Sequence, residues 1–569
     1  MKKTTQKFTA SALAVLTAVS LCACNINTSS TEGKTTTQTT VTADTSEKAA
    51  VSNEASESTA SSVNGNSEDT QTGTADAVSG NDSANSAVTT ATGTFAITTE
   101  DGNVTENGSI YTITSGGTYV LTGVLANGQV IVTAGEDEEV ELDLSGVSIT
   151  CDNDSPIYVY SAGKVKIKAV VGTENTVNDV RPLQTDENDT TGTAAIYALC
   201  DLNIVGTGKL TVTASYNNGI HTKDDLKIKN LTLSVAAPNN ALKGNDSVTI
   251  ESGTLKILST EGDGIKTTNS DVSEKGNQRG IVTIAGGTIE IYAAVDGIDA
   301  AYDFVMTDGS LTVNAQDDAV HAEQTVQIDG GYIDVTDSHE GIEGHYVTIN
   351  DGEIHVYADD DGINATASSN NRADGVITVN GGKVYVEVSG QDVDGLDSNG
   401  SYYQTGGFVV VSNPSANGGG MSGALDTDGT VSVTGGVILA LGGGANGMGG
   451  MGGQQGGFGG QQGPGNMGGQ HGPGSMGGQH GPGNMSDDSS EDYTTELMGY
   501  GGMGGGFGMG GMMMGGSMPS GAVSYTGTLS AGTHSFTYNG TTETFTLKNA
   551  VSGGWIWASG ISANNYTLN

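Results

Sequence analysis

A short phrase that recurs along the middle of the chain limits the possible folds more than any other feature. EGDGIKTT, which begins at Glu261, returns as AVDGIDAA, QDDAVHAE, SHEGIEGH, DDDGINAT and QDVDGLDS. The small residue of each phrase marks a column with spacings of 22, 23, 33, 22, 22, 21, 33 and 29 residues. Ile157 and Ile196 look like earlier members of the aliphatic column beside it, which gives about eleven turns. Self-similarity at this period indicates stacked structural repeats. The marker residues are Gly219, Ala241, Gly264, Gly297, Ala319, Gly341, Gly362, Gly395 and Ala424.

Each repeat reads as three short strands separated by glycine-containing corners. In the repeat that begins at Ile281, Ile289 and Ile291 alternate with Glu290 and Tyr292, as expected for strands with one buried face. The chain lacks the Leu and Asn ladder of leucine-rich repeats and the nonapeptide of calcium-binding rolls. We therefore expect an all-β fold, namely a right-handed parallel β-helix of about 22-residue coils with a small C-terminal β segment.

Stacking the coils in register would align acidic side chains in two columns on the outer surface, on either side of the inward aliphatic residue. Carboxylates about 4.8 Å apart repel by roughly 3.5 kcal/mol per neighbouring pair at an effective dielectric constant near 20. They would take up protons, turn into solvent or hold cations, and Ca²⁺ suits a surface of many oxygen ligands. Alternatively, Asp-Gly is a favoured turn pair that needs no ligand. The candidate calcium ligands are Asp263, Asp296, Asp317, Asp318, Glu340, Asp361 and Asp394 in or beside the first column, and Asp299, Glu343, Asn364, Asp397 and Asp426 in the second.

One strand of each repeat carries tyrosine and acidic residues at its outward positions. Tyrosine rings can stack on the C–H faces of sugars while carboxylates accept hydrogen bonds from sugar hydroxyls, so a flat wall of such residues suits an extended polymer. High strand propensity is an equally good reason for any single tyrosine. Trp555 and Trp557 fall on one side of a strand and fit a core better than a sugar platform. The candidate carbohydrate-binding residues are Glu290, Tyr292, Asp334, His355, Tyr357, Tyr385 and Glu387, together with Arg279 and Arg372 at the ends of two polar insertions.

The N-terminus has the features of a bacterial export signal. Lys2 and Lys3 precede an apolar run that is too short to span a membrane. The following sequence Leu-Cys-Ala-Cys, which ends at Cys24, resembles the lipobox of bacterial lipoproteins. By that resemblance Cys24 becomes the first residue of the mature protein and carries the lipid that anchors it to the membrane. An ordinary secretory signal with two chance cysteines is the alternative.

Composition divides the chain into five segments. We expect a signal peptide at 1–23, a Ser/Thr-rich disordered stalk at 24–92, the parallel β-helix at 93–441, a Gly/Met/Gln-rich low-complexity insertion at 442–521 and a closing β segment at 522–569. Cys151 and Cys200 fit core thiols, although a disulfide is possible outside the cell. The formal net charge of -44 argues against nucleic-acid partners and favours cations or neutral ligands.

Several consecutive phrases together resemble a known family. GGTYVLTGVLANGQVIVTA at Gly116, VELDLSGVSIT at Val140, AAIYALCDLNIVGTGKLTVTA at Ala194, GIHTKDDLKIKNLTLSV at Gly219 and the DGI repeats look like the bacterial carbohydrate-binding β-helix lipoproteins, whose architecture is related to that of pectate lyases. The resemblance covers roughly residues 93–440, and the Gly/Met/Gln-rich insertion departs from it. It implies calcium-dependent, non-catalytic binding of plant-type polysaccharide, including cellulose and pectin, on the extracellular face of the bacterial cell membrane.

Two other functions remain open from the sequence. The first is a calcium-stiffened surface adhesin that binds another protein. The second is a polysaccharide lyase, which needs a base such as Arg or Lys beside its calcium. The chain has three arginines, of which Arg279 and Arg372 lie four coils apart and cannot act on one bond. Lys243 and Lys266, beside the acidic columns, are the other candidates for a catalytic base.

Overall fold

The computed structural model describes residues 88–569 except 187, 368–373, 391–392, 419–422 and 443–518. The expected signal peptide, Cys24, Arg372, most of the stalk and most of the insertion lie outside these residues. Within them the chain is all-β, as expected, apart from a 3₁₀ turn at Pro414–Gly418. A 39-stranded sheet and a 3-stranded sheet account for the strands that pair. Thr89 already pairs with Thr173, so regular structure begins within the segment expected to be a stalk.

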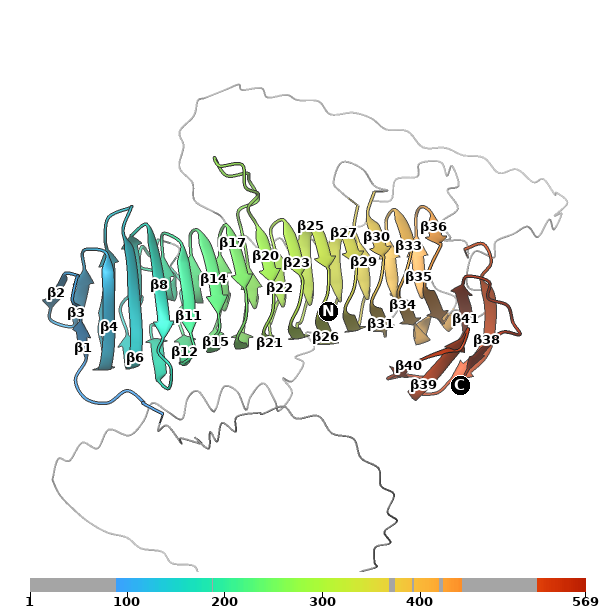
Figure 1. Ribbon diagram of the computed structural model, residues 1–569, viewed down its shortest axis with the longest axis horizontal. Helices are drawn as coiled ribbons and strands as arrows, with labels where there is room; N and C mark the ends of the chain where they lie inside the picture. The colour runs from blue at the N-terminus through green and yellow to red at the C-terminus, as the bar shows by residue number, and fades with distance from the viewer. Residues whose placement is uncertain (1–87, 187, 368–373, 391–392, 419–422, 443–518) are drawn as a thin grey trace, which may run out of the picture. The chain divides into compact units, whose positions relative to one another are not determined.

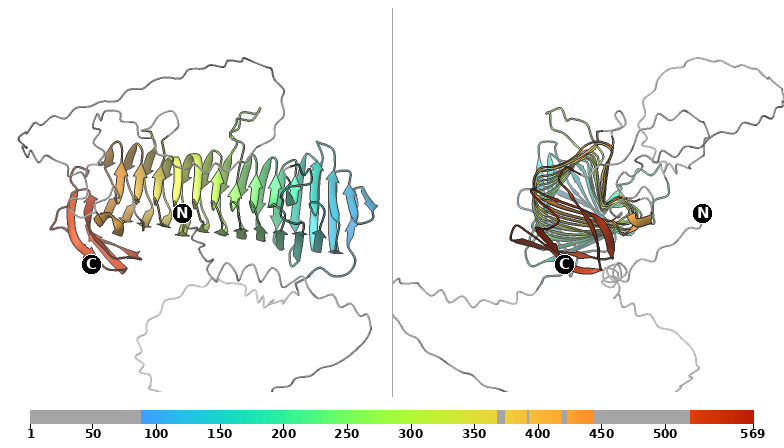
Figure 2. Two further views of the ribbon diagram at one scale, coloured as in Figure 1. Left: turned by 180° about the vertical axis from the view of Figure 1, so that it is seen from behind. Right: turned by 90° about the vertical axis from the view of Figure 1, so that its right-hand side faces the viewer.

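Most strands belong to three columns, in which strands from successive repeats lie side by side and pair in parallel (Figure 1). The chain passes through columns A, B and C in turn, and one such passage is called a coil here. Seen along the stack, the strands surround a common interior (Figure 2, right).

The strands of column A pair as far as β35 through matching residues of successive coils. They are β3 (Ile110–Ile113), β5 (Gln129–Thr133), β7 (Ile157–Ser161), β10 (Ala194–Ala198), β13 (Asn218–Thr222), β16 (Leu242–Gly244), β19 (Ile265–Lys266), β22 (Ile298–Ala300), the first parts of β25 (Val320–Ile328) and β27 (Ile342–Ile349), β29 (Ile363–Ala365), β32 (Leu396–Ser398) and β35 (Leu425–Thr427).

Columns B and C share two long strands near the N-terminal end of the stack, β4 (Gly117–Leu125) and β6 (Glu139–Cys151). Column B continues with β8 (Lys164–Ala169), β11 (Leu202–Gly206), β14 (Asp225–Lys229), β17 (Ser247–Ile250), β20 (Ile281–Ile284), β23 (Asp303–Met306), the second parts of β25 and β27, β30 (Val376–Val379), β33 (Ser401–Gln404) and β36 (Val431–Val433). Column C continues with β9 (Glu174–Asp179), β12 (Lys209–Ala214), β15 (Thr232–Ala237), β18 (Thr254–Ser259), β21 (Thr288–Tyr292), β24 (Ser310–Asn314), β26 (Tyr332–Asp337), β28 (Glu353–Ala358), β31 (Lys383–Val388), β34 (Phe408–Ser412) and β37 (Val437–Leu441).

Inward aliphatic side chains from the three columns form one continuous core. In column A, Ile157 lies opposite Ile196, and Ile196 lies opposite Ile220, which confirms the expected early members of the aliphatic column. All three side chains are buried. Burial of an Ile or Leu side chain contributes about 1.5–3 kcal/mol, so the repeated aliphatic positions are the main reason that the coils stack.

The small marker residue is required because neighbouring coils approach closely at the corner before column A. A Cβ added to Gly297 would lie 2.5 Å from the carbonyl oxygen of Ala319 and 2.4 Å from Cγ1 of Val313. Alanine occurs at the same position in other coils, including Ala319 itself, so the corner accepts a methyl group where the local backbone allows it. Larger side chains would separate the coils, which explains why the recurring phrase keeps a small residue.

Antiparallel strands cover part of both ends of the stack. At the N-terminal end, β1 (Ala96–Thr98) pairs with β4, and β2 (Val104–Asn107) pairs with β3. At the other end, β41 (Val551–Ala558) pairs with β37 and with β38 (Val523–Leu529). The separate sheet consists of β39 (Gly532–Tyr538), β40 (Thr541–Leu547) and β42 (Tyr566–Leu568).

The C-terminal strands contribute to two hydrophobic cores. Trp555 and Trp557 are buried in the core of the stack, as expected from the sequence. Ile556 lies in a second core with Phe536 and Leu439. Cys151 and Cys200 are free and buried, so they act as core thiols.

Candidate cation cluster and carbohydrate pocket

The first acidic column lies at the corner before column A, and its residues are in register. The backbone N–H of Gly264 donates to the carbonyl of Asp296 at 2.9 Å, and that of Gly297 donates to the carbonyl of Asp318 at 2.8 Å. Oδ1 of Asp263 accepts from the N–H of Asp296 at 3.2 Å, and Oδ1 of Asp296 accepts from the N–H of Asp318 at 3.1 Å. These carboxylates tie one coil to the next, so part of the column has a structural role that needs no cation.

The same type of hydrogen bond, from a backbone N–H to the side-chain oxygen of the preceding coil, is found in other coils of the stack. Upstream it is made by the amide oxygens of Asn218 and Asn240, and downstream by the carboxylates of Asp361 and Asp394. At Glu340 the contact differs, because Oε2 of this longer side chain accepts from Nδ2 of Asn364 at 3.1 Å. The change of pattern occurs where the acidic side chains are most crowded.

The second acidic column follows the inward aliphatic residue of column A. Lys266 lies opposite Asp299, which lies opposite His321, and the series continues through Glu343 and Asn364. Nζ of Lys266 lies 2.5 Å from Oδ2 of Asp299 and 2.8 Å from Oδ2 of Asp263, so it neutralises the start of both columns. The last two members are Asp397 and Asp426.

The two columns converge in three clusters whose potential ligand atoms all lie within 4.8 Å of one another. The clusters include six of the twelve expected calcium ligands and add His321, which the sequence analysis missed. His321 occupies the position of the second Asp in the phrase DGIDA, and that alignment was the available signal. The clusters are Asp296, Asp299 and His321; Asp296, Asp317 and Asp318; and Asp318, Glu340 and Glu343.

The other expected ligands lie in the same columns but outside these clusters. Asp263 is only 4% exposed and pairs with Lys266, so it does not lie on the open outer surface that the sequence suggested. Asn364 lies beside the third cluster through its bond to Glu340. The remaining members are Asp361, Asp394, Asp397 and Asp426, and burial raises the pKa of the first three to about 7, about 8 and about 6.

An unpartnered oxygen accompanies the third cluster. Asn364 is 8% exposed, and its Oδ1 is buried without a hydrogen-bond partner. Its Nδ2 donates to Glu340, so the amide lies next to the carboxylates. A buried carbonyl oxygen without a partner costs about 1–3 kcal/mol, which a bound cation would relieve.

The electrostatic environment disfavours ionised carboxylates when no cation is bound. Burial, followed by the charges of Asp263 and Asp299, raises the pKa of Asp296 to about 7. Burial and the charge of Glu343 raise the pKa of Glu340 to about 7. Burial and the hydrogen-bonded Glu343 carboxyl raise the pKa of Asp318 further above its ordinary range. Protons therefore compete with a cation for these carboxylates near neutral pH.

The ligand types differ between the clusters. Asp318, Glu340, Glu343 and Asn364 offer only oxygen atoms, which hard cations such as Ca²⁺ prefer. The cluster with His321 includes a nitrogen, which suits transition metals better. Burial opposes protonation of His321, but the Asp299 hydrogen bond and the charge of Glu343 raise its pKa to about 9. A protonated imidazole cannot ligate a metal, so the all-oxygen cluster is the better calcium candidate.

The expected carbohydrate-binding residues lie on the outer face of column C. Glu290, Asp334, His355 and Tyr385 occupy one aligned row across the coils. Tyr292 lies in the neighbouring row, where its hydroxyl donates to Oε1 of Glu290 at 3.0 Å. A bulge between Val313 and Asn314 shifts the register there, so that Asp337 rather than Thr336 lies opposite Asn314.

The C-terminal segment covers part of this face, contrary to the open wall that the sequence suggested. Glu387 is only 7% exposed, because its Oε2 accepts from the backbone N–H of Lys548 at 2.7 Å and its Oε1 from Nδ2 of Asn549 at 2.8 Å. The ammonium of Lys548 lies 3.5 Å from the ring centroid of Tyr357. The repeats gave no signal for these contacts, because each joins residues more than 150 positions apart in the sequence.

A pocket of about 180 Å³ lies between column C and the C-terminal segment. Five of the expected carbohydrate-binding residues line it, namely Asp334, His355, Tyr357, Tyr385 and Glu387. Its other wall includes Phe545, Thr546, Leu547 and Lys548.

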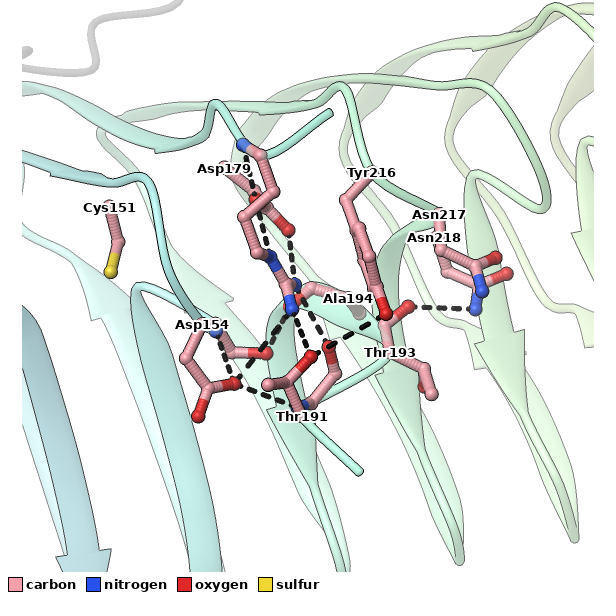
Figure 3. Close-up of polar contacts among 12 residues, drawn as sticks. Cys151, Asp154, Asp179, Thr191, Thr193, Ala194, Tyr216, Asn217 and Asn218 are labelled. Carbon is pink, nitrogen blue, oxygen red and sulfur yellow. Dashed lines mark hydrogen bonds and ion pairs between the residues drawn. The ribbon is translucent and has the colours of Figure 1, made fainter. Parts of the chain in front are cut away.

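The described arginines do not lie at this pocket. Arg279 forms ion pairs with Asp246 at 2.6 Å and Asp271 at 3.1 Å, in the insertion before column B. Arg181 is 4% exposed, and its Nε and Nη2 bind the two oxygens of Asp179 at 2.9 and 2.5 Å. Its guanidinium also lies 3.7 Å from the ring centroid of Tyr216. Asp179, Thr191 and Tyr216 converge in this region of the stack (Figure 3). Both arginines therefore have structural contacts.

Lys266 is poorly suited to act as a base. Burial opposes its charge, but the carboxylates of Asp263 and Asp299 outweigh burial and raise its pKa above the ordinary value. A lysine must be neutral to abstract a proton, and this environment holds the proton on Nζ.

Among the described residues, no helix is long and apolar enough to cross a membrane.

Comparisons with known proteins identify a family and two similar proteins. Residues 107–319 and 309–450 match the family model of carbohydrate-binding domain-containing proteins, and together these ranges span more than half of the chain. A carbohydrate-binding domain-containing protein of Acetivibrio thermocellus is 41% identical over 126 residues, which cover 22% of this chain and 44% of the relative. The chain thus spans less than half the length of that curated relative. A polysaccharide lyase-like protein from C. thermocellum, solved as a gadolinium derivative, is 36% identical with a TM-score of 0.33, over 41% of this chain and 86% of that one.

Proposed function

Since the chain belongs to the family of carbohydrate-binding domain-containing proteins, we propose that it binds plant-type polysaccharide, cellulose or pectin, through the outer face of column C. The observation that carries this proposal is the convergence of Asp334, His355 and Tyr385 at one pocket. Aromatic rings and carboxylates side by side provide stacking surfaces and hydrogen-bond acceptors for sugar hydroxyls.

Binding without cleavage is the activity that this arrangement supports. A lyase requires a base at the site of reaction. Among the described residues, Arg181 and Arg279 are held in ion pairs and the proton of Lys266 is stabilised by two carboxylates. Lys243 lies opposite Lys266 in column A and does not line the pocket. We therefore propose that the protein has no catalytic activity on the polymer.

The three columns of parallel strands support a right-handed parallel β-helix. A connection between parallel strands of one sheet is right-handed in nearly all known cases. The coils then form a rigid wall whose outer rows repeat about every 4.8 Å.

We propose that calcium binds at the all-oxygen cluster of Asp318, Glu340, Glu343 and Asn364. The support comes from the proximity of the three carboxylates, the unpartnered Oδ1 of Asn364 and the raised pKa values of Asp318 and Glu340. When bound, the ion would compensate buried negative charge and tie neighbouring coils together, so its expected role is to stiffen the stack.

We also propose that the protein is displayed on the outside of the bacterial membrane through a lipid on Cys24. The support is the sequence before this cysteine, which resembles a lipobox. Incorporation of labelled fatty acid that is lost in Cys24→Ala would support the anchor. Equal labelling of both proteins would contradict it.

The experiment for polysaccharide binding is retention of the purified chain on insoluble cellulose and on cross-linked polygalacturonate, with calcium and then with EDTA. His355→Ala is expected to reduce retention at least threefold. His339→Ala is the control outside the pocket, because both histidines are partly exposed and pair with carboxylates. His355 lies 3.0 Å from Glu353, and His339 lies 2.8 Å from Asp359 and 3.4 Å from Asp360. Absence of retention on either polymer under both conditions would refute polysaccharide binding and favour a surface adhesin.

A further inference from the structure

The outer face of column C is interrupted along the stack. As far as β31 its strands alternate buried and more exposed residues, but β34 and β37 are buried almost throughout. Val409 and Val411 face the core of the stack, whereas Phe408 and Val410 belong to the second core with the C-terminal strands. Figure 1 shows β39 and β40 beside this end of the stack. The accessible face therefore ends at β31.

Specific polar contacts hold the covering strands in place. Nζ of Lys383 on β31 lies 2.8 Å from Oε2 of Glu543 on β40. The two hydrogen bonds of Glu387 fix the chain directly after β40, and Nζ of Lys548 donates to the carbonyl of Thr336 at 3.3 Å. These bonds form a fixed wall across the direction in which the rows of column C run.

A row of aromatic rings leads toward this wall. The rings of Tyr332 and His355 have centroids 5.6 Å apart, and those of His355 and Tyr385 stack at 4.7 Å with an interplanar angle of 27°. Tyr385 is followed by Phe408, which is 6% exposed beneath the C-terminal strands. The accessible part of the row thus ends inside the pocket.

We propose that this pocket receives the terminal sugar ring of a neutral glycan that lies along column C, so that the protein recognises chain ends. This inference rests on the proposed polysaccharide binding and adds the mode of binding. The pocket volume of about 180 Å³ suits a single ring, since pockets for larger ligands usually exceed about 300 Å³. An internal segment of a long chain would have to continue through Leu547 and Lys548, and the wall blocks that path.

The charges of the lining favour a neutral sugar over a uronate. Asp334 and Glu387 contribute two carboxylates, and Lys548 contributes one ammonium. That ammonium already lies over the ring of Tyr357. The charge of the whole chain is also strongly negative, at -44. A free carboxylate on the ligand would meet net repulsion, whereas hydroxyl groups can donate to Asp334.

The test is calorimetric titration of the full chain with cellotriose, cellohexaose and trigalacturonate. A site for chain ends predicts nearly equal affinity, within threefold, for the trisaccharide and the hexasaccharide, and at least tenfold weaker binding of trigalacturonate. Thr546→Trp, at the exposed rim of the pocket, is expected to weaken cellotriose binding at least tenfold. Thr542→Trp is the matched control, because both threonines are exposed on β40 and each shares a hydroxyl hydrogen bond with a threonine of β39.

The outcomes separate this inference from the function on which it rests. Retention of the wild type on cellulose, combined with unchanged cellotriose binding by Thr546→Trp, would overturn the pocket and leave polysaccharide binding intact. Affinity that rises more than tenfold from the trisaccharide to the hexasaccharide would indicate an extended site and also overturn the inference. Tighter binding of trigalacturonate would overturn the assignment of a neutral ligand. Absence of binding to every glycan would refute both proposals.

Discussion

Glu387 accepts a hydrogen bond from the backbone N–H of Lys548 at 2.7 Å and thereby joins column C to the C-terminal segment. The carboxylate is largely buried, and its second oxygen accepts a hydrogen bond from Nδ2 of Asn549. A residue that the sequence suggested for sugar binding therefore has a positioning role, because it holds the wall of the pocket.

The contact predicts that Glu387→Ala destabilises the C-terminal segment. Hydrogen bonds to charged groups contribute about 1.5–3 kcal/mol each, and the substitution leaves two donors without their acceptor. We expect faster proteolysis within residues 519–569 and a lower unfolding midpoint. Glu323→Ala removes an exposed glutamate elsewhere and should leave both unchanged. Equal proteolysis of the two variants would contradict the role of Glu387.

Calcium is expected to raise the melting temperature of the protein. A ligand that binds only the native state at 100 times its Kd stabilises it by about 2.7 kcal/mol. Glu343→Gln should abolish most of this shift, because it removes a charged ligand from the all-oxygen cluster. Glu323→Gln, the same change at an exposed site, should retain the full shift. Differential scanning calorimetry with calcium and with EDTA provides the measurement, and equal shifts in both variants would place the ion elsewhere.

His221 predicts a loss of stability in acid. Burial, together with the charges of Lys243 and Lys223, lowers its pKa to about 3. The neutral ring contacts the hydroxyl of Thr193 at 2.8 Å and Oδ1 of Asn245 at 3.0 Å. Between about pH 6.5 and pH 3 the unfolded chain binds a proton that the native state does not. Stability therefore falls as the pH falls through this window, by up to about 1.4 kcal/mol per pH unit.

The corresponding variant is His221→Asn, which removes this titration. At pH 7 the variant should melt below the wild type, because it loses the two hydrogen bonds. The difference between the two melting temperatures should be smaller at pH 4.5. Only the wild type has a histidine that is protonated in the unfolded chain and neutral in the native state, so only the wild type loses stability for this reason. A difference between the melting temperatures that does not change with pH would show that His221 is not responsible.

The buried pair of Arg181 and Asp179 gives a fourth prediction. Arg181→Ala leaves the carboxylate of Asp179 buried at 0% exposure without its cation, and such a loss costs about 3–5 kcal/mol. Replacing both residues with apolar ones of similar size, as Asp179→Leu with Arg181→Met, should cost less. Urea unfolding followed by circular dichroism compares them, and a double variant that is less stable than Arg181→Ala would contradict this account.

The stacked columns could be predicted because the repeat itself contains the register. Once Ile196 and Ile220 are recognised as equivalent, the residues before and after them must align, and the structure pairs them in that way. The two acidic columns follow from the same alignment. The burial of these acidic residues does not follow from the alignment. The pattern places Asp263 at a corner but does not show how closely the adjoining coils enclose it.

The position of the C-terminal segment over column C could not be predicted from the repeat, because it depends on contacts with a segment of different sequence. One signal was available. The strands FVVVS at Phe408 and VILAL at Val437 lose the alternation of the earlier repeats, and continuous apolar strands are typically buried on both faces. The bulge at Thr336 left no comparable signal, since the extra residue in β26 does not change the character of the strand.

The antiparallel pairing of β41 with β37 has a consequence for association between molecules. A stack of parallel strands would otherwise end in a row of free N–H and C=O groups, ready to pair with another copy. Instead, β41 runs against the last strand of column C, and its tryptophans fill the end of the core. At the first end, β1 pairs antiparallel with Val120, Leu121 and Thr122 of β4, mostly in the part of that strand that belongs to column B. The C-terminal end of column C therefore does not act as a template for fibre growth.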